Sequence, residues 1–119
     1  MAGLNNTAKN SMLDNLGGLA VYASLHTADP GATGTSEVTG GSPAYARKAL
    51  TWAAAATASK SSNVGLVFDV PAVTITHLGY WSAVSAGTFY GSRPLDTNQV
   101  FATQGTYTVA SGGVTETLT

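Results

Sequence analysis

The chain has 119 residues, of which 44% are hydrophobic and 9% are charged, and its formal net charge at pH 7 is -1. This length suits one domain with a single core, and the composition is unlike that of a disordered chain. The charge balance offers no basic surface for nucleic acid or anionic membranes, and the absence of cysteine excludes disulfides and thiol chemistry.

No targeting or membrane segment is expected. The first ten residues contain one lysine and no apolar run of signal-peptide length. No stretch approaches the roughly 18 apolar residues of a membrane span. We therefore predict a protein that is made in the cytoplasm and does not insert into a membrane.

The first predicted element is a short helix at residues 4–16, within an amino-terminal arm of residues 1–18. Helical spacing brings its apolar side chains to one face: Leu4, Ala8, Met12, Leu13 and Leu16. Asn5, Asn6 and Thr7 offer oxygens for an amino-terminal cap, and Gly17-Gly18 predicts the end of the helix. The other face carries the polar residues Lys9, Asn10 and Asp14. With one apolar and one polar face, the helix is predicted to lie on a sheet or on a neighbouring subunit.

From residue 19 the period changes to two, which predicts a half-buried strand at 19–26. Residues 27–43 then form the longest loop, because Asp29-Pro30-Gly31 predicts a turn and further glycines interrupt any regular element. Long loops in small domains are often functional.

The remaining strand candidates are separated by proline and glycine, and they lie at residues 44–53, 65–70, 73–82, 88–95 and 107–118. The alanine run at 53–58 favours helix intrinsically, but the polar residues after it favour a strand end and a loop. The pattern predicts an all-β fold, a compact antiparallel β-sandwich or barrel of jelly-roll type with one short amino-terminal helix, in a single domain of residues 1–119.

Chemistry-bearing residues are few. His26 and Asp29 are the nearest approach to a site, as a base with its orienting carboxylate or as a cation ligand. The favoured interpretation is structural, with Asp29 capping the turn and His26 packed at a strand end. The sequence has no nucleophile elbow, phosphate-binding loop or metal-ligand spacing. We expect no enzyme activity, no catalytic residue, no metal and no cofactor.

Four aromatic residues lie in one predicted hairpin. Trp81 and Phe89 are expected in the core, whereas Tyr80 and Tyr90 are candidate exposed contacts for a partner or a sugar. Arg93 is expected to pair with a carboxylate at the surface.

Several segments resemble, in order, a family of short tailed-bacteriophage virion proteins described as tail-fibre or minor tail proteins. These segments are SLHTADPG at 24–31, EVTGG at 37–41, AYAR at 44–47, FDVPA at 68–72, THLGYWSA at 76–83 and GTFYG at 87–91. NSMLD at 10–14 is also similar, so the resemblance extends to about residue 109. It implies a virion component of β-sandwich type, and it supplies no catalytic residue. The carboxyl end differs from this pattern, because the sequence has a Thr-rich final strand there and no recognisable receptor-binding extension.

The leading hypothesis is a non-enzymatic virion protein, surface-mounted as a tail-fibre or minor tail component. The alternatives are a capsid decoration protein and a host-surface carbohydrate-binding module. The expected partners are other virion proteins and further copies of the chain, a trimer being one option, with a host glycan as a third. The candidate interface residues are Leu4, Met12, Leu13, His26, Asp29, Glu37, Tyr45 and Arg47.

Overall fold

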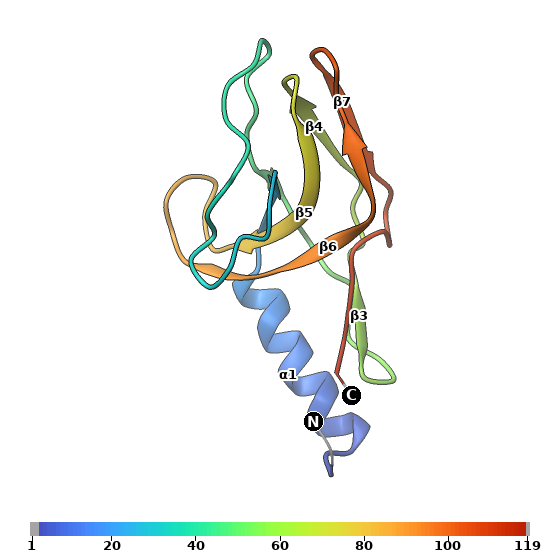
Figure 1. Cartoon of the computed structure of the whole chain (residues 1–119). Helices are drawn as coiled ribbons and strands as arrows, with labels where there is room; N and C mark the ends of the chain where they lie inside the picture. The colour runs from blue at the N-terminus through green and yellow to red at the C-terminus, as the bar shows by residue number, and fades with distance from the viewer. Residues whose placement is uncertain (1–2, 119) are drawn as a thin grey trace.

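The computed structural model describes residues 3–118, and Figure 1 shows a β-rich body with one helix extending from it. Helix α1 spans Asn6–Leu19. The strands are β1 (Tyr22–His26), β2 (Lys48–Ala49), β3 (Ser59–Ser61), β4 (Leu66–Val70), β5 (Thr74–Trp81), β6 (Phe89–Val100), β7 (Gly105–Val109) and β8 (Thr115–Thr117). The predicted all-β class with one short helix is confirmed.

All strand pairs are antiparallel. Strands β2, β1, β5 and β6 form a four-stranded sheet in that order, while β3 pairs with β8 and β4 pairs with β7. Alternate residues of β4, namely Leu66, Phe68 and Val70, turn inward and share one core with Leu25 and Leu78 of the large sheet. The β4–β7 pair and the large sheet are thus two layers held together by apolar burial.

Strand β1 was predicted to be half-buried, but its residues from Ala23 to His26 are buried on both faces. The reason is that other side chains cover both of its faces. One face carries Ala23 and Leu25 into the core. The other carries Ser24 and His26 against the indole of Trp81 and the ring of Phe89.

The helix was predicted to end at Gly17-Gly18, but α1 continues to Leu19. Gly17 serves close packing, since a methyl group there would overlap Cε of Lys60 on β3. Asn5 is the amino-terminal cap, and its side chain accepts from the amide of Ala8, as predicted. Within residues 3–118, no helix has the length and apolarity needed to cross a membrane.

Three other predicted boundaries are wrong. Pro94 lies inside β6 instead of ending it, because β6 is an edge strand where a missing amide hydrogen is tolerated. The predicted strand at 107–118 is two strands, β7 and β8, separated by a turn at 110–113. Of the strand predicted at 44–53, only β2 forms a ladder. The alanine run at 53–58 is non-helical, as predicted.

The molecule is elongated, with extents of 46 × 26 × 24 Å. At one end α1 packs on β3 (Figure 1). At the opposite end lie three turns, at residues 40–44, 71–73 and 101–104, which we name the tip turns. Gln104 joins two of them, because its side chain accepts from the amide of Ser42 at 3.1 Å and donates to the carbonyl of Pro43 at 3.2 Å.

Candidate functional site

An open groove lies where the loop after β1 meets the loop between β5 and β6. Its volume is about 310 Å³, at the lower end of the range of small-molecule sites. The residues that line it are Glu37, Val38, Thr39, Gly40, Tyr45, Ala46, Arg47, Val84, Ser85 and Ala86. The fold therefore brings together three residues that the sequence singled out, Glu37, Tyr45 and Arg47, from segments with no regular secondary structure.

These three side chains form one hydrogen-bonded unit. Arg47 makes a two-pronged contact with Glu37, with Nε 2.9 Å from Oε2 and Nη2 2.8 Å from Oε1. The Tyr45 hydroxyl donates to Glu37 at 2.8 Å and accepts from the amide of Leu25 at 2.9 Å. Burial raises the pKa of the Tyr45 phenol, and the Glu37 charge adds to this effect. All three groups are thus engaged with one another.

Arg47 also fixes the loop between β5 and β6. Its Nη1 donates to the carbonyls of Ala83 and Ala86, at 3.0 and 2.8 Å, and its guanidinium lies over the ring of Trp81. A planar guanidinium suits this combination of paired hydrogen bonds and stacking. The side chain of Arg47 is only 9% exposed. Arg47 therefore shapes one wall of the groove.

His26 lies behind this unit and belongs to a buried relay. Trp81 Nε1 donates to Ser24 Oγ at 2.9 Å, and Ser24 Oγ lies 2.7 Å from His26 Nε2. His26 Nδ1 donates to the carbonyl of Thr35 at 2.8 Å, because a carbonyl can only accept. Burial lowers the pKa of His26 and favours the neutral imidazole, whose Nε2 then accepts from the Ser24 hydroxyl. His26 has no exposed surface, so it cannot contact a partner directly.

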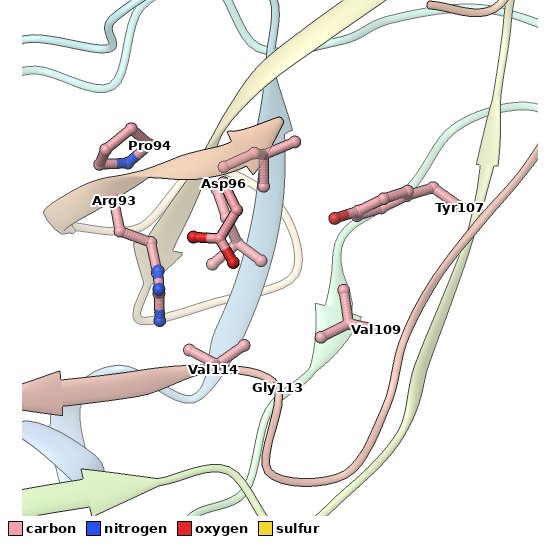
Figure 2. Close-up of a pocket in the computed structure, with 9 residues that line it drawn as sticks. Arg93, Pro94, Asp96, Tyr107, Val109, Gly113 and Val114 are labelled. Carbon is pink, nitrogen blue, oxygen red and sulfur yellow. The ribbon is translucent and has the colours of Figure 1, made fainter. Parts of the chain in front are cut away.

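A second, smaller cavity lies between β6, β7 and the turn that precedes β8 (Figure 2). Its volume is about 70 Å³, enough for a few water molecules and well below the size of ordinary ligand sites. Arg93, Asp96 and Tyr107 are the polar side chains on its wall. Burial raises the pKa of Tyr107, and the Asp96 charge adds to this effect.

Two further predictions for this region are settled by contacts. Arg93 was expected to pair with a carboxylate, but its Nη1 donates to the carbonyl of Thr115 at 2.8 Å and forms no ion pair within residues 3–118. Asp29 caps its turn as expected, with Oδ1 accepting from the amide of Gly31 at 2.9 Å, and it lies outside the groove.

The predicted exposed aromatic pair does not exist. Tyr80 is only 3% exposed, because its ring packs in the core against Trp52 and its hydroxyl donates to Glu116. Tyr90 is exposed, so it stands without its predicted partner. Trp81 is buried as predicted, and Phe89 is half-buried against it.

The three apolar candidates near the amino terminus lie in or beside α1, far from the groove in the fold (Figure 1). Met12 is exposed, Leu4 is half-buried and Leu13 is buried. Leu13 therefore contacts this chain's own body and is not available to a partner. The sequence analysis assigned Met12 and Leu13 to one face of the helix. Adjacent residues lie about 100° apart around the helix axis, so one of the two can be exposed while the other is buried.

One pair at the helix escaped the sequence analysis. Lys60 of β3 is buried and donates to Asp14 of α1 at 2.6 Å and to the carbonyl of Ala53 at 2.8 Å. The Lys60 ammonium lowers the pKa of the Asp14 carboxyl, with help from the amide of Ala55. These residues are 46 positions apart, and no local signal links them.

The groove is thus a shaped surface whose charged and phenolic side chains, Glu37, Tyr45 and Arg47, already bond to the protein. The rest of its lining consists of the side chains of Thr39 and Ser85, backbone groups and apolar atoms, such as those of Val84, which is 53% exposed. Across residues 3–118, no group of three or more histidine or acidic side chains is arranged to hold a metal ion. What the groove can offer a partner is shape, apolar contact and two hydroxyl groups.

Comparison with known proteins gives one family. The family model described as "Podophage GP4 fiber I protein gp80" matches residues 3–117. No curated protein matches the chain.

Proposed function

Because the chain belongs to this family of podophage fibre proteins, we propose that it is a small, non-enzymatic subunit of the tail fibre that acts through protein–protein contacts. Membership implies a structural component of the virion that contacts other virion proteins. The observation that carries the proposal is the match itself, which extends over nearly the whole chain.

The groove supports a role in contact over one in catalysis. A general base needs a free lone pair within reach of a substrate, but both nitrogens of His26 are bonded inside the protein. The carboxylate of Glu37 is occupied by Arg47 and Tyr45. A surface built this way keeps its shape when a partner docks, so little conformational entropy is lost on binding.

The decisive measurement is the location of the protein on the virion. Purified particles would be labelled with an antibody against the chain and imaged, and its copies would be counted by quantitative mass spectrometry relative to the major capsid protein. The proposal expects label on the fibres and a copy number far below that of the capsid protein. Label over the head, with hundreds of copies, would contradict it and favour the decoration alternative. Absence from the particle would contradict any structural role.

We also propose that residues 1–119 act as one folding unit. The support is a single apolar core that includes residues of β1, β4, β5 and β7. The chain is expected to unfold in one cooperative transition, with intrinsic fluorescence and circular dichroism giving the same midpoint. Two separate midpoints would contradict this.

A further inference from the structure

Helix α1 meets the body through a face that combines polar and apolar residues. Asn10 accepts from the amide of Ala58 at 2.8 Å, and Asp14 binds Lys60 and the amide of Ala55. Gly17 lets the Lys60 side chain pass close to the helix axis. Leu13 is the only fully buried side chain of the helix, and Leu16 is half-buried against the core.

The opposite face of α1 carries an apolar stripe. At 3.6 residues per turn, Ala8, Met12, Asn15 and Leu19 lie within about 60° of arc, centred about 180° from the side that carries Asn10 and Gly17. Met12 is 42% exposed, Leu19 is 39% exposed and Asn15 is also exposed. Figure 1 shows β3 along one side of α1, with the rest of the body beyond the helix's carboxyl end. We name these four residues the outer stripe.

This arrangement leaves apolar side chains on two sides of the helix. An ordinary surface helix turns its one apolar stripe to the core and its polar residues to water. In α1, Leu13 and Leu16 face the body, whereas Met12 and Leu19 are exposed on another side. A helix with a second apolar side gains apolar burial when something covers that side.

We propose that the outer stripe is the seam between copies of this chain, with their α1 helices packed in parallel around a common axis. This inference deepens the proposed fibre role and names the subunit contact. The spacing from residue 8 to 12, 15 and 19 follows the 4-3-4 rhythm of a coiled-coil seam.

The chemistry of the stripe favours a second copy as the occupant. The four side chains carry no charge, so identical stripes do not repel. Asn15 is self-complementary, because its amide both donates and accepts and can pair with the same residue of a neighbour. A single Asn in such a seam is a known means of fixing register.

The register also favours the parallel arrangement. Parallel helices place Asn15 beside Asn15, whereas antiparallel helices centred on the stripe would place Asn15 beside Met12 and leave the amide without a polar partner. Because α1 is only about 21 Å long, one helix pair covers little area beside the ~1,200–2,000 Å² that stable complexes bury. A closed ring of more than two copies, in which each helix meets two neighbours, therefore suits this stripe better than a dimer.

The absence of cysteine allows a direct test of the geometry with the full chain. Leu19→Cys and Met12→Cys should each form disulfide-linked dimers under mild oxidation. Thr7→Cys, exposed on the same helix but about 110° from the stripe's centre, should not. In an antiparallel pair the two Leu19 positions would lie about 16 Å apart along the axis, too far for a disulfide. Cross-linking of Met12→Cys alone would therefore overturn the parallel arrangement.

Mass measurement by light scattering after size exclusion gives the second test. The wild-type chain should be oligomeric at micromolar concentration, and the double variant Met12→Glu/Leu19→Glu should be monomeric. Thr7→Glu is the matched control and should keep the wild-type mass. The circular dichroism spectra of all three should agree, which separates loss of assembly from loss of folding.

The outcomes distinguish this inference from the fibre role. If the wild-type chain is monomeric at up to 100-fold higher concentration, and the Leu19→Cys variant forms no disulfide-linked dimer, the seam between copies is overturned. The fibre role would survive that result if the wild-type chain still labels the fibres. If the double variant is also lost from virions while the wild-type chain is monomeric in solution, the stripe binds a different virion protein, and the inference of self-association is wrong.

Discussion

The guanidinium of Arg47 lies over the indole of Trp81, with Cζ 3.7 Å from the ring centroid, and the same side chain pairs with Glu37. The contact joins the loop after β1 to the end of β5. It fixes the shape of the groove between these segments, because Arg47 bonds to Glu37 and Ala86, which line the groove, and to Ala83, which directly precedes the lining residues 84–86.

The first prediction concerns this contact. Arg47→Ala should lower the free energy of unfolding by about 3 kcal/mol, because Glu37 would keep a partly buried charge without its partner. The measurement is chemical denaturation followed by tryptophan fluorescence. Lys48→Ala changes the adjacent basic residue, which is half-buried and forms no ion pair within residues 3–118, and should cost less than about 1 kcal/mol. If both variants lose the same free energy of unfolding, the contacts of Arg47 contribute nothing to stability.

Lysine should not replace arginine here. Arg47→Lys keeps the charge but cannot make the two-pronged contact with Glu37 while also reaching Ala83 and Ala86. We expect it to recover less than half of the stability lost in Arg47→Ala. Faster amide exchange in the 82–87 loop of Arg47→Lys, with the other loops unchanged, would localise the effect. Full recovery of stability would contradict the geometric argument.

The buried relay predicts a dependence of stability on pH. The folded protein holds His26 neutral, so its pKa is lowered relative to about 6.5 in the unfolded chain. As pH falls through 6.5, the unfolded state binds a proton that the folded state does not, so stability falls with pH below about 7. The charges near His26 are those of Glu37, His77 and Arg47. The slope should be visible in unfolding midpoints measured from pH 7.5 to 5.

The other histidine provides the control for this slope. His26→Gln should be less stable at pH 7.5, because a glutamine cannot bond both Ser24 and Thr35 in the same way, but its stability should change little between pH 7.5 and 5. His77→Gln should keep the wild-type slope. If His77→Gln instead abolishes the slope, the titrating group is not the relay histidine.

The sequence predicted the parts of this fold that depend on local pattern. Alternation at residues 73–82 predicted β5, and the Asn5 cap was found because capping acts within one helical turn. Glu37, Tyr45 and Arg47 were named as candidate interface residues, but the hydrogen bonds between them could not be predicted. These bonds depend on the path of loops whose sequence has no periodicity. The polar contacts between α1 and the body were also missed, because Asp14 bonds to Lys60 and to the amide of Ala55, which are 46 and 41 residues away. Gly17 looked like a helix stop for the same reason.

The two helical glycines give a matched pair of predictions. Gly18→Ala should raise stability by up to about 1 kcal/mol, because alanine favours helix and a methyl group there meets no atom within 4 Å. Gly17→Ala has the same intrinsic gain but would push Lys60 away from Asp14 and Ala53. The expected order of thermal midpoints is Gly18→Ala, wild type, Gly17→Ala. A stabilised Gly17→Ala would show that Lys60 moves aside at little cost.

The last prediction concerns the tip turns. Gln104 holds the turn at 40–44 through Ser42 and Pro43, and both hydrogen bonds are exposed to solvent. Because an exposed bond of this kind contributes about 1 kcal/mol or less, Gln104→Ala should leave the global unfolding midpoint nearly unchanged. Its effect should be local, with amide exchange at Ser42 rising about 5- to 10-fold as the turn opens more often. Gln99→Ala removes a side chain whose amide donates to Thr97 within β6, so exchange at Ser42 should stay at the wild-type rate. A rise in both variants would mean that the tip turns loosen through the sheet and not through Gln104.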